Sequence, residues 1–269
     1  MRSLEKIPIS LVVVLTAALT AISLSGQSHP NQSVGDPNKE IMALFQDYPI
    51  VSFNPGNPTK PEGRERRARS LRHNNKNLNE SSAKLFIFQE KTDAVSLTVP
   101  TAHSPDEIAL PVNQSNAVVI GNVRDAQAYL SSDNTNVYSE FTVGVEEILK
   151  DNSAATISTG GSLTAERAGG RVRLPSGRVI LRGDMRKSMP VPGRRYLLFL
   201  EFNEEVQTYS ILTGYELRAG QTFPLDGNRR FKEGQKYEQL VGYDRYEGVS
   251  EITFLNEVRE AIASSATNK

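Results

Sequence analysis

The stretch 137–150, VYSEFTVGVEEILK, carries three carboxylates of the kind an active site uses: Glu140, Glu146 and Glu147. Glycosidases need two such carboxylates facing each other across a cleft. The stretch alternates apolar and polar residues with the period of a β-strand, so Glu140 and Glu146 share the face opposite the apolar residues. We expect both on the solvent face and Glu147 at the fraying end of the strand. No catalytic role is predicted for any of the three.

The remaining chemistry-bearing residues are sparse. His29, His73 and His103 have no partners at metal-ligand spacing, and no H-E-x-x-H motif occurs. The sequence also lacks the G-x-S-x-G and S-x-x-K motifs of serine hydrolases. We therefore predict no catalytic residues, no metal site and no cofactor. The enzymatic alternative is a hydrolase whose carboxylate pair comes from separate strands, drawn from Asp125, Glu140, Glu166 and Asp184.

One segment is strongly basic, RERRARSLRHNNKN at 64–77. The first interpretation is a solvated helix or tail, because charge runs usually solvate a surface. The functional alternatives are contact with an anionic envelope polymer or lipid surface, or a nick site for trypsin-like proteases. Nucleic acid is disfavoured, because no aromatic residues are interleaved for stacking. The candidate binding residues are Arg64, Arg66, Arg67, Arg69 and Arg72.

The composition of the 269-residue chain narrows the function classes. Lys plus Arg and Asp plus Glu both number 31, and cysteine is absent. The charge balance gives no global attraction toward nucleic acid or anionic membranes. Without cysteine there is no disulfide, no thiol nucleophile and no cysteine metal ligand, so the fold must be stabilised by packing.

Residues 1–25 have the layout of a secretory signal peptide, with basic residues before the apolar run 11–24 and small residues after it. Cleavage is expected between Ser23 and Gly26. The apolar run is shorter than the roughly 20 residues of a membrane span, so we predict no transmembrane segment after cleavage. The expected location is secreted or periplasmic, and an uncleaved anchor is the alternative.

The pattern after residue 83 predicts a mainly β fold. Six segments have strand character and are separated by turn residues such as those of 131–136: 117–130, 137–150, 171–174, 178–182, 194–202 and 207–215. Strands at hairpin spacing without intervening helices predict an antiparallel barrel or sandwich. The stretch 196–200 is apolar on both faces, which predicts a central strand. A C-terminal helix is expected, with Thr253 as its cap.

The sequence divides into five parts. Their boundaries are 1–25 for the signal peptide, 26–82 for a flexible, partly helical region with the basic segment, 83–111 for a β segment and Pro-rich connector, 112–226 for the barrel, and 227–269 for an extended tail and the C-terminal helix.

Four runs in the barrel region carry a resemblance: AVVIGNV, YSEFTVGVEEILK, GGRVRLPSGRV and PVPGRRYLLFL. Their order resembles a group of uncharacterised bacterial exported proteins and, more distantly, the OB-type barrel of netrin-like domains and tissue metalloproteinase inhibitors. The resemblance covers roughly residues 112 to 226 and implies an OB-like barrel. In those inhibitors an N-terminal cysteine chelates the zinc of the target, and this chain has no cysteine to carry that role.

The function predicted from the sequence is an exported, non-catalytic binding or structural module of the cell envelope or extracellular space. Its expected partner is an envelope or extracellular protein or an anionic polymer. The alternatives are the carboxylate-pair hydrolase and an inhibitor-like partner of a secreted protease. The sequence leaves the ligand and the oligomeric state open.

Overall fold

The computed structural model describes residues 45–53, 63–74, 96–98, 108–184, 187–227 and 242–267. The elements in these ranges are, in chain order, β1 (Ile50–Ser52), α2 (Arg64–Arg72), β2 (Ser96–Thr98), β3 (Ala117–Leu130), β4 (Val137–Lys150), β5 (Ser162–Ala168), β6 (Gly170–Arg173), β7 (Val179–Asp184), β8 (Arg195–Asn203), β9 (Thr208–Arg218), β10 (Gln221–Pro224), the short 3-10 helix η3 (Asp244–Tyr246) and α4 (Glu251–Thr267).

Several sequence predictions fall outside the described residues. They are the signal peptide with its cleavage point, much of the predicted flexible region 26–82 and of the segment 83–111, His29 and His103, and residues 228–241 of the predicted tail.

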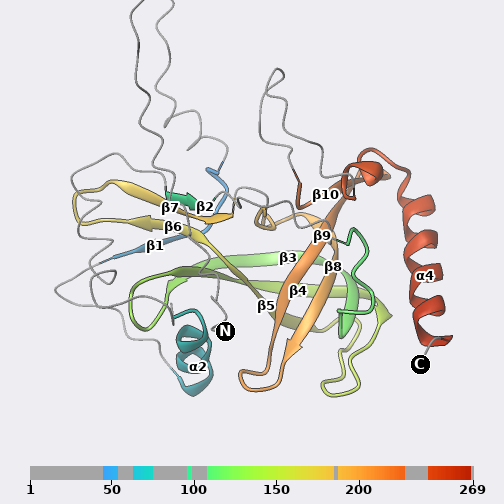
Figure 1. Ribbon diagram of the computed structural model, residues 1–269, viewed down its shortest axis with the longest axis horizontal. Helices are drawn as coiled ribbons and strands as arrows, with labels where there is room; N and C mark the ends of the chain where they lie inside the picture. Colours follow the sequence, from blue (N-terminus) through green and yellow to red (C-terminus); the bar gives the residue numbers. More distant parts are fainter. Residues whose placement is uncertain are drawn as a thin grey trace, which may run out of the picture. The chain divides into compact units, whose positions relative to one another are not determined.

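Five strands form a closed barrel in the order β3-β4-β5-β9-β8, with β8 pairing back onto β3. Figure 1 shows β3 and β4 running together across the molecule, with β8 and β9 crossing beside them. All neighbours are antiparallel except β5 and β9. The predicted mainly β fold with a barrel and a C-terminal helix is confirmed. The single parallel pair, β5 with β9, arises because strand directions cannot alternate all the way around a ring with an odd number of strands.

A second sheet has the order β1-β6-β7-β2, and it contains the hairpin of β6 and β7. Both edge strands join it in parallel. Figure 1 shows these short strands beside one end of the long β3–β4 pair. The chain passes from β5 into β6 at Gly169 and Gly170, whose φ angles of 114° and 150° suit glycine.

The barrel is filled by alternate residues of its strands, as the period of a strand requires. Phe141, Val143 and Val145 of β4 are all buried in this core, which confirms their predicted face. Tyr196 and Leu198 of β8 lie in the same core, together with Tyr209 of β9.

The opposite face of β8 packs outward against the C-terminal elements. Leu197 and Phe199 belong to a second cluster with Tyr215, Tyr246 and Phe254. The β8 strand is therefore buried on both faces, as its sequence predicts. Helix α4 begins at Glu251, so Thr253 lies inside the helix and the predicted cap is wrong.

Three strands have no counterpart in the sequence prediction. These are β1, IVS, β5, SLTAERA, and β10, QTFP. In β5 only Leu163 and the two alanines at 165 and 168 are apolar, so the usual alternation of large apolar residues is weak. Its place in the barrel comes from pairing with β4 and β9.

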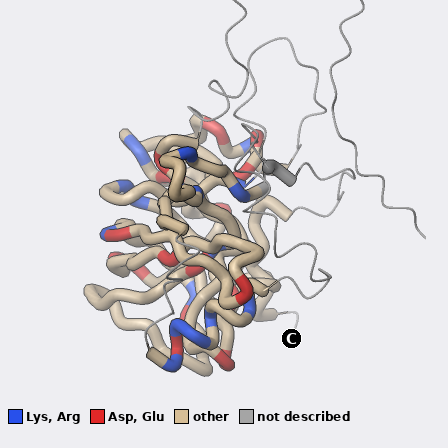
Figure 2. The backbone as a smooth tube through the Cα atoms, turned by 90° about the vertical axis from the view of Figure 1, so that its left-hand side faces the viewer, with Lys and Arg blue, Asp and Glu red and all other residues tan. Residues whose placement is uncertain are grey.

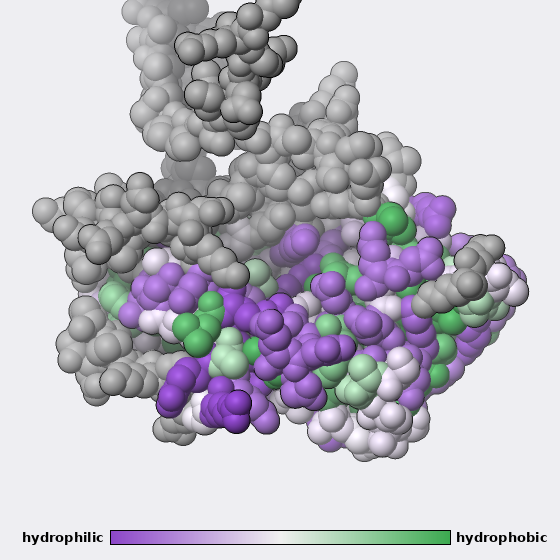
Figure 3. Space-filling view, turned by 60° about the horizontal axis from the view of Figure 1, so that its bottom comes forward, coloured by the Kyte–Doolittle hydropathy of each residue, from purple (hydrophilic) through white to green (hydrophobic). Residues whose placement is uncertain are grey.

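The outer surface of the described part is mixed. Lys and Arg are interspersed with Asp and Glu in the described part (Figure 2), and hydrophobic residues are scattered among hydrophilic ones on the face in Figure 3. Within the described ranges, α2 and α4 are the α-helices, and neither has the length and apolar character that a bilayer span requires.

Candidate functional site

The basic segment folds onto the barrel as helix α2. The helix begins after Gly63, whose φ of 78° suits glycine, and it ends before His73. The hydroxyl of Ser70 donates a hydrogen bond to the carbonyl of Leu130, and the amide of Asn136 donates to the carbonyl of His73. These contacts fix the helix against the β3–β4 turn.

Arg69 of α2 forms a buried ion pair with Glu140 of β4. The guanidinium Nε and Nη2 donate to the two carboxylate oxygens at 2.8 and 3.3 Å, and both side chains are about 10% exposed. Burial lowers the pKa of Arg69, but the hydrogen bond and charge of Glu140 more than offset this, so the pKa lies above its ordinary value. The predicted solvent-exposed position of Glu140 is therefore wrong, because α2 covers this end of the strand.

A second acidic residue, Glu166 of β5, lies directly opposite Glu140 in the β4–β5 register. Arg72 donates to its Oε1 at 2.5 Å, and His73 Nε2 lies 3.5 Å from its Oε2. The two carboxylates are neighbours on one face of the sheet, and each has its own arginine from α2. Both residues belong to the carboxylates from which the alternative hydrolase would draw its pair, and the fold brings these two together.

The imidazole of His73 stacks on the ring of Tyr138, with centroids 4.2 Å apart and planes 8° apart. Tyr138 is fully buried, and burial together with the charge of Glu140 raises its pKa. The sequence places His73 in the region 26–82, for which flexibility is predicted. In the structure its ring is instead held between the tyrosine and the Glu166 carboxylate.

The other predicted carboxylates lie apart from this cluster. Glu146 is exposed, as predicted, and pairs with Arg195. Glu147 pairs with Arg259 of α4. Asp125 is exposed on β3, and the side chain of Asp184 lies outside the described residues.

The five arginines named as binding residues have different surroundings. Arg69 and Arg72 are held by the barrel carboxylates, and the guanidinium of Arg66 lies 4.6 Å from the ring centroid of Tyr129. Arg64 and Arg67 are exposed. Contact with an anionic polymer remains a hypothesis, and these two residues are the ones whose side chains are exposed for it.

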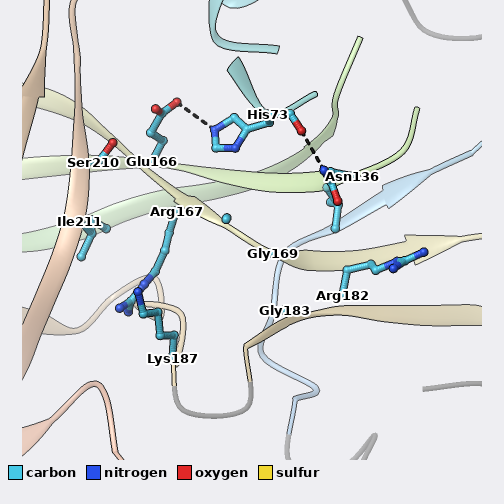
Figure 4. Close-up of a pocket in the computed structure, with 12 residues that line it drawn as sticks. His73, Asn136, Glu166, Arg167, Gly169, Arg182, Gly183, Lys187, Ser210 and Ile211 are labelled. Carbon is cyan, nitrogen blue, oxygen red and sulfur yellow. Dashed lines mark hydrogen bonds and ion pairs between the residues drawn. The ribbon is translucent and has the colours of Figure 1, made fainter. Parts of the chain in front are cut away.

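A pocket of about 500 Å³ opens where β5 leaves β9. The two strands pair only at Ala165–Tyr209 and Glu166–Ser210, after which β5 turns toward the second sheet. Figure 4 shows Glu166 and His73 on one side of β5 and Arg167 and Lys187 on the other. The lining residues are His73, Asn136, Val137, Glu166, Arg167, Ala168, Gly169, Arg182, Gly183, Lys187, Ser210 and Ile211.

Two polar atoms in the pocket wall have no hydrogen-bond partner among the described residues, namely Glu166 Oε2 and His73 Nε2. Glu166 is 1% exposed. A buried carboxylate oxygen without a donor costs about 1–3 kcal/mol or more relative to a satisfied one. The two atoms lie 3.5 Å apart, so the imidazole nitrogen is the polar group that this oxygen faces.

Basic groups outnumber acidic ones in the lining. The Arg167 guanidinium is held by the Asp226 carboxylate at 2.5 Å and by the Ser188 carbonyl. Burial lowers the pKa of Arg182. Lys187 is exposed and forms no ion pair with any described residue. The described lining therefore contains three Lys or Arg side chains and one carboxylate, that of Glu166.

The polar residues of the pocket are not arranged as a nucleophilic relay. Figure 4 places Ser210 and His73 on opposite sides of Glu166, so the carboxylate lies between the hydroxyl and the imidazole. A serine nucleophile needs the imidazole next to the hydroxyl. Among the described residues, no group of three or more His, Asp or Glu side chains has the arrangement of a metal site.

The sequence predicted Arg69 and Arg72 as part of a binding surface, but it missed the pocket. Arg182 and Lys187 come from β7 and the residues just after it, Ser210 comes from β9, and only the packing of the second sheet against the barrel brings them together. No protein-family model matches the chain, and no curated protein matches its sequence. The geometry of the barrel and pocket therefore carries the functional argument.

Proposed function

We propose that this chain is an exported, non-catalytic binding module built on an OB-type barrel, and that the pocket is its ligand site. The observation that carries the proposal is the pocket of about 500 Å³, into whose lining separate segments bring polar side chains that include His73, Glu166 and Ser210. Binding sites commonly combine a cavity of about 300–1,000 Å³ with a few convergent polar groups, and this pocket fits that description. Because the chain is predicted to be exported, the expected ligand is a compound of the envelope or the extracellular space.

The connectivity of the barrel supports the OB assignment. Its second and third strands, β4 and β5, pair with each other, and the fifth strand, β9, inserts between the third and the fourth. OB-folds are five-stranded barrels that bind ligands on the face of strands two and three and on the loops joining strands one to two and four to five. Here Asn136 comes from the first of these loops, and Ser210 lies just beyond the second.

A carboxylate-pair hydrolase is the second candidate, because Glu140 and Glu166 are cross-strand neighbours. A binding function explains the surroundings of these two carboxylates better than catalysis does. Each carboxylate is already held by an arginine, and Glu140 lies beneath α2 with both oxygens occupied. A general acid or nucleophile must instead face the substrate.

The proposal is tested by a thermal-shift screen of the purified protein against small polar compounds of the envelope and medium. A ligand at one hundred times its Kd stabilises a protein by about 2.7 kcal/mol, which raises Tm by about 5–10 °C for a protein of this size. The variant Gly183→Leu adds a large side chain at the wall of the pocket, and among the described residues a Cβ at this position has space, since Tyr48 lies 3.8 Å away. Gly183→Ala is the matched control.

We expect ligand shifts to disappear in Gly183→Leu and to persist in Gly183→Ala. Hits that survive Gly183→Leu would contradict the proposal, as would a screen without hits. A hit that is turned over by the protein, with turnover lost in Glu166→Gln, would support the hydrolase instead.

A further inference from the structure

Helix α2 is attached to the barrel with very little apolar contact. Its buried residues are Arg69 and Ser70, and no residue of the helix belongs to the three hydrophobic clusters of the described part. Its one leucine, Leu71, is 52% exposed. Most helices in proteins are stabilised by packing an apolar face. Helix α2 is held instead by charges, rings and hydrogen bonds, which are the contacts that select a charged segment of a separate protein.

Two arginines of α2 bind two carboxylates that lie side by side on the sheet. Arg69 pairs with Glu140 of β4, and Arg72 pairs with Glu166 of β5. Residues three apart on a helix have Cβ atoms about 5–6 Å apart. The two glutamates are directly opposed in the β4–β5 pair, and opposed residues have Cβ atoms about 4.5–5.5 Å apart. The spacing of the arginines therefore matches the spacing of the carboxylates.

Two tyrosine rings of the β3–β4 hairpin extend this surface. The guanidinium of Arg66, three residues before Arg69, lies 4.6 Å from the ring centroid of Tyr129. The ring of Tyr129 is tilted against that of Tyr138, with centroids 5.7 Å apart. Such a surface favours arginine over lysine, because a guanidinium stacks on rings and pairs with carboxylates through several donors. The surface therefore fits a helix side that carries an arginine at every third position.

We propose that this acidic and aromatic surface is a docking site for a helical segment of a partner protein with arginines three residues apart, and that α2 occupies it within the chain. The inference goes beyond the pocket, because it assigns a protein partner to a second surface, which meets the pocket at His73 and Glu166. A buried ion pair contributes little net stability, although the loss of one member is costly. A partner segment that replaces the arginines of α2 one for one therefore competes with it.

The test supplies the helix in trans to the full chain. A synthetic peptide of residues 63–74, GRERRARSLRHN, is labelled with fluorescein, and its binding is measured by fluorescence anisotropy at low ionic strength. The open variant combines Arg69→Met with Arg72→Met, which removes both ion pairs of α2. The matched control combines Arg64→Met with Arg67→Met, which removes two exposed arginines of the same helix and leaves both pairs in place.

We expect the peptide to bind the open variant at least about tenfold more tightly than the wild type or the control, whose own tethered helix competes for the surface. A peptide with Arg69→Met and Arg72→Met should not bind. A peptide with Arg64→Met and Arg67→Met should keep its affinity within about threefold, because exposed charges contribute little. The unchanged peptide should also raise the Tm of the open variant, since it returns partners to the two buried carboxylates.

Amide hydrogen exchange of the wild type decides the question if the open variant does not fold. The peptide is added at millimolar concentration, which is near the effective concentration of a tethered segment. It carries carbon-13 and nitrogen-15, so mass spectrometry separates its fragments from those of the chain. Exchange should become faster in α2 and stay unchanged in α4, and the peptide with Arg69→Met and Arg72→Met should have no effect.

The opposite results would overturn the docking surface. They are a folded open variant that does not bind the peptide, equal binding of the two substituted peptides, or, where the open variant is unfolded, unchanged exchange of α2 in the wild type. Wild-type dimers in light scattering that disappear in the open variant would assign the surface to α2 of a second copy and overturn the separate partner. The pocket proposal is tested independently, because neither measurement uses a pocket ligand.

Discussion

Replacing Arg69 with Met removes a guanidinium and keeps most of the side-chain volume. Glu140, whose side chain is 9% exposed, then loses the partner that occupies both of its oxygens. It also faces Glu166 directly across the β4–β5 pair, and like charges at opposed positions destabilise a sheet. Leaving one member of a buried ion pair without its partner costs about 3–5 kcal/mol. We expect Arg69→Met to lose that much stability.

Removing the charge of the other partner, by Glu140→Gln, should lower the free energy of unfolding by less. Arg69 keeps Glu65 at 3.9 Å as a second partner, and that contact is open to solvent because the Glu65 side chain is 76% exposed. In the double variant neither charge is left alone, so its loss should fall short of the sum of the single losses. A coupling free energy of at least about 1.5 kcal/mol is expected, within the range for contacting residues.

Urea unfolding followed by circular dichroism measures these differences, with unchanged m values showing that only stability has moved. Arg67→Met, on the exposed side of the same helix, should change stability by no more than about 0.5 kcal/mol. Equal losses for Arg67→Met and Arg69→Met, or a coupling near zero, would refute the buried pair as the anchor of α2.

Two further predictions concern the barrel. Burial raises the pKa of Tyr196 to about 12, from an ordinary value of 10.0, and also raises that of Tyr215. Since the folded state favours the neutral phenol, this stabilisation is complete below pH 10 and is lost as the pH rises toward 12. Tyrosinate absorbance should therefore appear together with unfolding, and titration of the buried rings near pH 10 in folded protein would contradict this. Gly121→Ala should destabilise by about 1–3 kcal/mol, because its Cβ would lie 2.4 Å from the carbonyl oxygen of Gly144. In Gly183→Ala the nearest atom is 3.8 Å away, so thermal unfolding should separate the two variants, and equal Tm values would count against the close approach.

The sequence by itself determined the strands whose burial follows from their own pattern. The bounds of β3 and β4 match the predicted 117–130 and 137–150, and the two-sided burial of β8 follows from its unbroken apolar run. In these strands the apolar side chains specify both the element and its inward face, because a slip of one residue would expose the whole set. The apolar stripe of α4, with Phe254 and Val258 buried, follows for the same reason.

Only the tertiary structure decided where the segments with weak apolar alternation lie and which charged side chains are buried. The strand β5 closes the barrel through backbone pairing with β4 and β9. Its amino-acid composition does not predict this pairing. The alternation in β4 correctly separated its two faces, but it carried no information about the helix that covers Glu140. That information lies in residues more than sixty positions away, since Arg69 precedes Glu140 by 71 residues. From sequence alone, a charged residue is predicted to lie in solvent. It is buried only where the fold brings a residue of opposite charge beside it, and that partner can be distant in the sequence.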